Sequence, residues 1–393
     1  MRRSASRQAA LTGVVALVLA AGHAAAQLRP APARRPNEGS GPHQRLVIRN
    51  AMVIDGAGAP PRGPVNIVIE GNRIVSVGGA GQNATHEIDA RGHYVMPGFI
   101  DLHVHGGGAP KNPDVEYAYK LWLAHGVTTV RGVPLGPFDF SLSEQRRSAR
   151  NEIVAPRIVN YQRPGSGWTR GSVDTPEQAR EWVRWAAEQG IDGLKLGAHD
   201  PEIMAALLDE AKKHGLGSTA HLAQTDVERM NALDAARLGL GAMTHFYGLF
   251  EALLKDYTIQ PWPAHHNHND EQDRFGQVAR LWDQIHPPGS EAWNELIHEF
   301  KSLDFIIDPT MTISAAADLV IVDQNPLENL KVLYGTGAIR LNDQTGQAER
   351  IGGIRYTIKD GIIYDAKQLL ADVAAMVERQ KRERLATQPQ PAR

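Results

Sequence analysis

The chain has 393 residues, of which 42% are hydrophobic, and its 42 Lys and Arg against 44 Asp and Glu give a net charge of −2. A chain of this length can bury a substantial core, and its balanced charge provides no basic face for nucleic acid. We therefore expect a small-molecule substrate and no nucleic-acid partner. The absence of cysteine excludes disulfides and thiolate ligands, so nitrogen and oxygen ligands must hold any metal.

The first 26 residues have the pattern of a signal peptide. Arg2 and Arg3 precede an apolar stretch over 10–20, and three alanines at 24–26 form a small-residue cleavage signature. Cleavage after Ala26 would release a periplasmic or secreted protein that no longer contacts the membrane. An uncleaved membrane anchor is the alternative, but the apolar stretch is shorter than the roughly 20 residues that a spanning helix needs.

The next two segments differ in composition. Residues 27–44 are rich in proline, glycine and charge without apolar periodicity, which predicts a flexible leader. Residues 45–98 contain short β-branched runs separated by turns, with a hairpin signal at Glu70-Gly71-Asn72. We expect 45–98 to form the first part of a small β-sandwich.

Residues 99–315 alternate strand-like and helical segments. The strongest helix signal covers 175–189, where Thr175 is a suitable N-cap, Pro176 stands in the first turn and Gly190 follows the end. Alternation of this kind predicts parallel strands with crossover helices, and a (β/α) barrel of the TIM type is the closed form. The fold class is therefore α/β.

Histidines mark the first barrel strand. His103 and His105 are two residues apart in the apolar stretch 94–108, so both imidazoles should emerge on one side of the strand. Further polar residues stand at the ends of later predicted strands, where barrel active sites form: Lys195, His221, His245 and Asp308. Alone, a strand histidine is more often a hydrogen-bonded core residue, and a strand-end lysine usually reaches water. Their combination with the His103 strand favours a metal site, and neutral imidazoles favour zinc.

The last third of the chain is less regular. Residues 258–300 include a group of polar residues that we interpret as a loop, with a second metal or substrate site as the alternative: His265, His266, His268 and Asp270. Residues 316–366 resemble the early β-rich segment, so the β-sandwich is predicted to be assembled from both ends of the chain. Residues 367–393 are expected to form a C-terminal helix and a disordered tail.

Several of these stretches together resemble the amidohydrolase superfamily, whose members are metal-dependent hydrolases with a (β/α) barrel and a composite β-sandwich. The resemblance covers about residues 45–366 and is carried by YVMPGFIDLHVH, KLGAHD, TAHL, AMTHFYG and ADLVIVDQNPLENL. It implies that His103 and His105 bind one divalent ion and that His221 and His245 bind a second. It also implies that Lys195, carbamylated by CO₂, bridges the two ions, which we expect to be zinc.

The resemblance implies a hydrolase that acts on the C–N bond of a small amide, cyclic amide or short peptide. A metal-bridging hydroxide would attack the carbonyl, because metals lower the pKa of bound water from 15.7 to about 7. The lysine chemistry is physically reasonable, since burial lowers a lysine pKa and only the neutral amine adds CO₂. The loops that select substrates vary in this fold, so the sequence does not identify the substrate.

The chain departs from the family pattern after the seventh predicted strand. The family continues with an eighth strand that carries a catalytic aspartate, but here FIIDPTMTIS is followed at once by AAADLVIVD. We therefore identify no catalytic aspartate, and Asp308 on the seventh strand is not assigned that role. The barrel is predicted to be incomplete and shorter than the roughly 250 residues of a typical one. Its open edge favours association into homo-oligomers.

Two alternatives follow. The first is a catalytically impaired, internally deleted amidohydrolase homologue that binds metal or ligand without turnover, because the missing aspartate would normally move protons in the reaction. The second is a purely structural α/β protein, which requires all five well-placed strand-end residues to be accidental.

Overall fold

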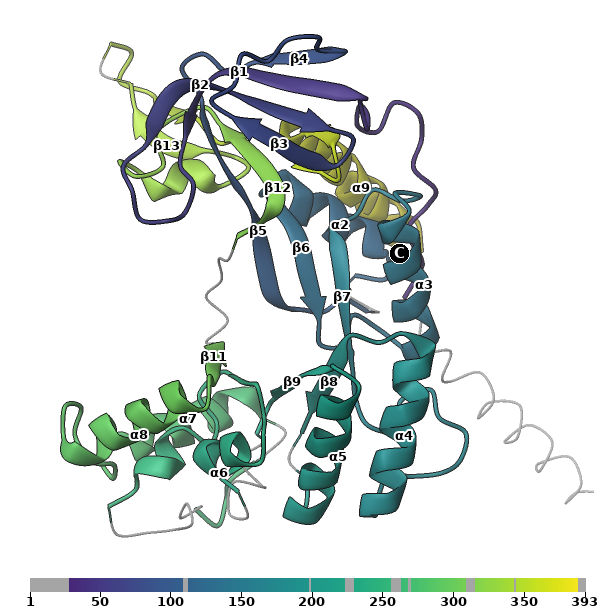
Figure 1. Cartoon of the computed structure of the whole chain (residues 1–393), viewed down its shortest axis with the longest axis vertical. Coiled ribbons are helices and arrows are strands. Elements are labelled where there is room, and N and C mark those ends of the chain that lie inside the picture. Colours follow the sequence, from purple (N-terminus) through teal and green to yellow (C-terminus); the bar gives the residue numbers. More distant parts are fainter. Residues whose placement is uncertain are drawn as a thin grey trace, which may run out of the picture.

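The computed structural model describes residues 28–108, 112–197, 199–222, 230–255, 263–267, 270–308, 315–342 and 344–387. The expected signal peptide at 1–26 lies outside these residues. Figure 1 shows a β-rich part near one end of the molecule and an α/β part that extends from it through the long strands β5, β6 and β7. None of the helices in the described ranges combines the length and apolar character needed to span a bilayer.

The α/β part contains seven parallel strands in chain order. They are β5 (Tyr94–Val104), β6 (Val127–Gly132), β7 (Arg157–Gln162), β8 (Gly193–Leu196), β9 (Gly217–Ala220), β10 (Ala242–Thr244) and β11 (Ile306–Asp308). The connecting helices are α2 (Val115–Ala124), α3 (Phe138–Ala149), α4 (Pro176–Gln189), α5 (Pro201–Lys213), α6 (Ala232–Arg237), η1 (Phe250–Leu253), α7 (Glu271–Leu281) and α8 (Glu291–Ser302). This confirms the predicted α/β class with barrel-type parallel strands.

The strands do not form a closed barrel among the described residues. β11 pairs with β10, whereas β5 pairs with β6, β1 and β12, and no pairing in these ranges joins β11 to β5. Ile306 and Ile307 of β11 are 54% and 40% exposed, as expected for an uncovered edge strand. Residues 309–314 lie outside the described part of the chain, so the absence of an eighth-strand aspartate stays a prediction.

The β-rich part is built from both ends of the chain, as predicted. Its strands are β1 (Arg45–Val53), β2 (Arg62–Glu70), β3 (Arg73–Val77), β4 (His86–Asp89), β12 (Ala315–Val322), β15 (Ile354–Lys359) and β16 (Ile362–Asp365). β12 pairs antiparallel with both β5 and β15, which joins the late strands to the early ones. Leu46, Ile67, Val95, Leu319 and Ile358 share one buried core. A separate hairpin of β13 (Ala338–Leu341) and β14 (Ala348–Ile351) follows η2 (Leu330–Leu333).

The segment before β1 packs against the rest of the fold, which differs from the flexible leader that its composition predicts. Ala31 is buried, and Glu38 accepts a hydrogen bond of 2.9 Å from Nζ of Lys120 on α2. The same ammonium contacts Asp372 of α9 (Ala366–Thr387) at 2.9 Å. A buried lysine needs such carboxylates. Because this segment is held by polar contacts, the pattern of apolar residues did not predict its packing against α2 and α9.

Local sequence signals predicted some helices and missed others. α4 begins with the expected capping box, in which Thr175 accepts from the backbone N–H of Gln178, and Gly190 ends it with φ = 95°. The region 258–300 is more regular than expected, since it contains α7 and α8. Asp270, which we interpreted as part of a polar loop, is the N-cap of α7 and accepts from two backbone N–H groups.

Glu251 on η1 is a buried carboxyl group that should make stability depend on pH. Burial raises its pKa from 4.5 to about 7, despite a hydrogen bond of 2.9 Å from the backbone N–H of Gly248. The folded protein therefore holds a proton that the unfolded chain releases. The resulting stabilisation is fully present below pH 4.5 and is lost as the pH rises through about 7.

We expect Glu251→Gln to remove this pH dependence. The wild type should lose about 2 to 3 kcal/mol of unfolding free energy relative to the variant as the pH rises from 5 to 8. Denaturant titrations at the two pH values measure the difference. Glu188→Gln on the exposed side of α4 is the matched control and should show no such change. A parallel pH response of wild type and Glu251→Gln would contradict the prediction.

Candidate active site

The four predicted histidines meet in a continuous group of rings. The ring centroids of His103 and His105 are 5.3 Å apart, those of His103 and His245 are 5.1 Å apart, and those of His245 and His221 are 5.1 Å apart. Lys195 lies beside them, and its Nζ donates a hydrogen bond of 3.0 Å to Oγ1 of Thr244, the neighbour of His245. The structure thus brings all five candidate residues to one end of the parallel strands.

Hydrogen bonds of the main chain fix the backbone positions from which His221 and His245 project. The N–H of His221 donates to the carbonyl of Leu196 at 3.0 Å, and the N–H of His245 donates to the carbonyl of Asp308 at 2.9 Å. His245 has φ = 63°, a left-handed conformation that is unusual for a residue other than glycine and that is often found at functional sites. Nδ1 of His105 donates to the carbonyl of Pro134 at 2.8 Å, which leaves Nε2 as its lone-pair nitrogen.

The electrostatics favour the neutral imidazole at His103, His105 and His221. Burial, followed by the positive charge of Lys195, lowers the pKa of His103 and that of His221 to about 3. Burial also lowers the pKa of Lys195 to about 7; Arg163 and Arg131 lower it further, while Asp308 opposes the shift. Nδ1 of His103 is buried without a hydrogen-bond partner among the described residues. Neutral imidazole nitrogens, one of them unsatisfied, are the donor type that binds divalent metals.

No set of three or more His, Asp or Glu side chains within the described ranges has the spacing to hold a metal ion as it stands. The predicted centre requires only two imidazoles for each ion, because the modified Lys195 would supply the shared oxygen ligands. The donor set therefore fits the predicted group, while the metal-binding role of its members stays a prediction.

Comparison with known proteins identifies the family. The model of the amidohydrolase family matches residues 94–325, which include all five candidate residues. The chain belongs to the amidohydrolase family.

Two curated proteins illustrate the relationship. This amidohydrolase is 30% identical over 181 residues to an N-acyl-D-aspartate deacylase from Alcaligenes xylosoxydans xylosoxydans, covering 43% of this chain and 35% of that protein. It is 28% identical over 300 residues to an adenine deaminase from Bacillus velezensis, covering 69% of this chain and 48% of that protein. The alignments thus span about a third to a half of these relatives.

Solved structures share the fold. A Xaa-Pro dipeptidase has a TM-score of 0.52 at 17% identity, with 82% of this chain and 100% of that chain covered. Phenylurea hydrolase B has a TM-score of 0.53 at 16% identity, with 83% and 98% covered. At these identities the likeness concerns the fold alone, and it agrees with the barrel-type strands of the amidohydrolase described above.

An ion pair that the sequence pattern did not predict lies beside the candidate site of this amidohydrolase. Arg131 of β6 donates through Nη2 to Asp308 of β11 at 3.0 Å and through Nε to the carbonyl of Leu102 on β5 at 2.7 Å. Both charged side chains are largely buried. An arginine within the apolar strand VTTVRGV was the available signal, because a charge in such a strand needs a buried partner. Through its bonds to Asp308 and to the carbonyl of Leu102, the Arg131 side chain links β11 to β5, the two strands between which the described sheet is open.

The histidine-rich segment of the amidohydrolase is only partly described. Nδ1 of His266 lies 3.1 Å from a carboxylate oxygen of Asp273 on α7, and the same oxygen accepts from the backbone N–H of Asn267 at 2.7 Å. These contacts tie the segment to α7. His268 lies outside the described residues, so the alternative of a second metal or substrate site stays untested.

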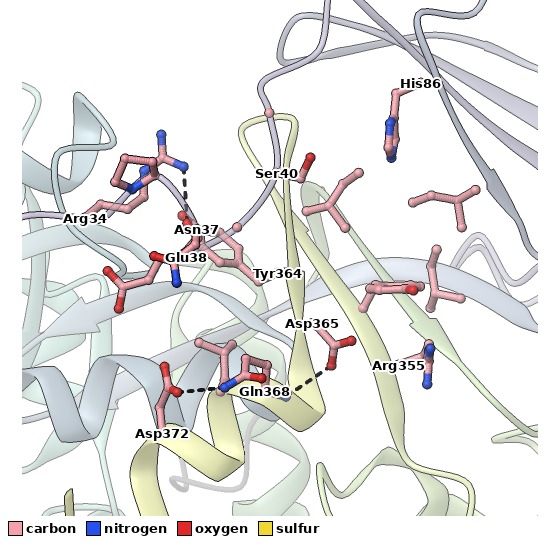
Figure 2. Close-up of a pocket in the computed structure, with 18 of the residues that line it drawn as sticks. Arg34, Asn37, Glu38, Ser40, His86, Arg355, Tyr364, Asp365, Gln368 and Asp372 are labelled. Carbon is pink, nitrogen blue, oxygen red and sulfur yellow. Dashed lines mark hydrogen bonds between the residues drawn. The ribbon is translucent and has the colours of Figure 1, made fainter. Parts of the chain in front are cut away.

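A cavity in the described part of the chain lies away from the histidine group. It has a volume of about 1060 Å³ and is bordered by the N-terminal segment, the β-rich part and the start of α9. Figure 2 shows Glu38 and Tyr364 at this cavity, with Gln368 donating to Asp372. None of the five candidate residues lines it. This cavity is therefore separate from the candidate site.

Proposed function

We propose that this amidohydrolase cleaves a C–N bond in a small amide, cyclic amide or short peptide. The observation that carries the proposal is the meeting of His103, His105, His221, His245 and Lys195 at the carboxyl ends of parallel strands in a chain that belongs to the family. His103 with His105 and His221 with His245 would each hold one zinc ion. When bound, such ions would lower the pKa of a bridging water and polarise the substrate carbonyl.

Lys195 is proposed to carry a carbamate. Its amine nitrogen attacks CO₂, forms an N–C bond and loses a proton, which leaves an anionic carboxylate-type group. This step requires the neutral amine, and burial supplies it by lowering the lysine pKa to about 7. Oγ1 of Thr244 accepts from Nζ and donates to the carbonyl of Ala220 at 3.0 Å, which holds the amine at the end of β10.

The activities for which the similar proteins are named support the reaction class. The deacylase and the dipeptidase are named for cleaving amide or peptide bonds, and the deaminase is named for removing an amino group. We propose the same general class, hydrolysis of C–N bonds in small molecules, for this chain. Export to the periplasm or beyond and association into homo-oligomers stay predictions.

A second candidate is a homologue that binds metal or ligand without turnover. The observation in its favour is that the described sheet is open between β11 and β5, where the resemblance places the strand with the catalytic aspartate. Asp308 lies on the strand at that edge, but its carboxylate already forms an ion pair with Arg131.

Zinc reconstitution in bicarbonate distinguishes the two candidates. We expect hydrolysis of at least one member of a panel of N-acyl amino acids, Xaa-Pro dipeptides and cyclic amides, at a low rate that rises with bicarbonate and disappears on chelation. Intact-mass analysis should show the mass of one added CO₂ on the wild type and not on Lys195→Arg. The exposed Lys213→Arg is the matched control and should retain the addition. Metal binding without any turnover would favour the second candidate.

A further inference from the structure

Arg163 stands next to Lys195 at the mouth of the candidate site. β7 ends at Gln162, so Arg163 is the first residue beyond its carboxyl end. The parallel register pairs Tyr161 with Gly193 and Gln162 with Leu194. Continuing this register by one residue places Arg163 alongside Lys195, at the spacing of about 5 Å that separates neighbouring strands.

Alternation along the strands shows which way Arg163 faces. The ring of Tyr161 covers Gly193 and Gly217, because a Cβ on either glycine would collide with it. The guanidinium of Arg131 lies 5.2 Å from the centroid of the same ring. Tyr161 is therefore on the inner face of the sheet, and Gly193 shares that face with Lys195. Arg163, two residues after Tyr161, faces the same side one layer closer to the mouth.

Arg163 differs from Arg131 in having no counter-charge within the described ranges. Arg131 is paired with Asp308, whereas no carboxylate in the described ranges forms an ion pair or hydrogen bond with the exposed guanidinium of Arg163. The positive charge of Arg163 nevertheless interacts with the site, because it lowers the pKa values of Lys195, His105 and His221. An unpaired cation that acts on three residues of one site is positioned for an anionic ligand.

The loop after β7 holds Arg163 in place. The backbone carbonyl of Arg163 accepts from the N–H of Ser166 at 3.0 Å, which closes a turn. The carbonyl of Ser166 in turn accepts from Nε1 of Trp182 on α4 at 3.3 Å. Because the turn is attached to a buried tryptophan, the start of the arginine side chain is fixed before any ligand arrives.

We propose that Arg163 binds a carboxylate of the substrate, so that the preferred substrates are N-acyl amino acids or peptides with a free carboxylate close to the scissile amide. The inference rests on the proposed C–N hydrolysis and specifies its substrate class. A guanidinium binds a carboxylate through two parallel hydrogen bonds, which fixes both the position and the orientation of the group. The amide would then lie between Arg163 and the histidine group.

Paired ligands that differ only in charge test the proposal. Calorimetry on the full-length, zinc-reconstituted protein would compare N-acetylated amino acids with their C-terminal amides. We expect Arg163→Met to weaken binding of the acids about 10- to 100-fold, as for a lost hydrogen bond to a charged group. Binding of the neutral amides should stay within about twofold of wild type, and Arg163→Lys should recover part of the affinity for the acids.

Arg170→Met is the matched control. It removes the same charge from the same loop, and Arg170 lies 3.9 Å from Glu181 instead of acting on the site residues. We expect it to leave the discrimination between acid and amide unchanged. Raising the salt concentration should weaken binding of the acids to the wild type more than to Arg163→Met. Equal loss of affinity for acids and amides in Arg163→Met, or equal discrimination in wild type and Arg163→Met, would overturn the proposal.

Failure of this inference is distinguishable from failure of the proposed function. If a ligand binds in a way that depends on Arg163 but is never hydrolysed, the proposed carboxylate site is supported and the proposed hydrolase activity is rejected. Hydrolysis of N-acyl amino acids with a free carboxylate at the same rate in wild type and Arg163→Met would retain the hydrolase and overturn the carboxylate site. The first outcome is measured by calorimetry and the second by product formation.

Discussion

Replacing His103 and His105 together by asparagine is expected to lower bound zinc from two ions per chain to one and to abolish hydrolysis. The two rings lie 5.3 Å apart, and burial keeps the pKa of each below its ordinary value, so both are neutral donors. Asparagine retains a polar side chain of similar size but is a weaker ligand for zinc. Loss of one ion should reduce kcat/KM by about 10³-fold or more, because several kcal/mol of transition-state stabilisation are removed.

Three further variants test this prediction. Replacing His221 and His245 should remove the other ion, and all four replacements together should leave no bound zinc, as measured by elemental analysis after gel filtration. His298→Asn on the exposed face of α8 is the matched control and should bind two ions. Unchanged metal content in the His103 and His105 variant would refute the assignment. Circular dichroism would show that each variant is folded.

The order of the strands and the positions of the site residues could be predicted from sequence because both depend on local patterns. His103 and His105 lie on an apolar strand with period-two alternation, and Lys195, His221 and His245 each follow a short apolar run. Parallel strands bring their carboxyl ends to one edge of a sheet. The structure accordingly places all five side chains together.

Features that depend on long-range polar contacts could not be predicted in this way. Glu38 and Lys120 are 82 positions apart, and Arg131 and Asp308 are 177 positions apart. No periodicity connects such residues, so the segment before β1 was expected to be flexible and Arg131 was overlooked. The short strand β11 also carries isoleucines that are exposed in the structure, which hydrophobic pattern alone would place in a core.

The role of Arg163 shows a further limit of sequence patterns. A single arginine after a strand is usually a solvated residue. Only the register between β7 and β8, together with the covering of two glycines by Tyr161, indicates that its side chain faces the histidine group. Three-dimensional register thus converts a common surface residue into a candidate for substrate recognition.

Replacing Arg131 by methionine is expected to destabilise the fold by about 3 to 5 kcal/mol, because the buried carboxylate of Asp308 would lose the guanidinium that pairs with it. Asp308 is only 4% exposed, and the arginine also donates to the carbonyl of Leu102, so the variant loses a contact to β5 as well as one to β11. Denaturant titrations measure the loss of unfolding free energy. Exposed Arg73→Met on β3 is the matched control and should change this free energy by less than about 0.5 kcal/mol.

A double-mutant cycle separates the ion pair from the packing of the two side chains. Asp308→Leu alone should also destabilise the fold, since Arg131 would then be the buried unpaired charge. The combination of Arg131→Met with Asp308→Leu should recover most of the lost stability, because two apolar side chains can replace a buried pair at little net cost. Additive losses in the double variant would show that the two side chains act independently. Recovery would instead establish that this one contact couples β6 to β11 across the open side of the sheet.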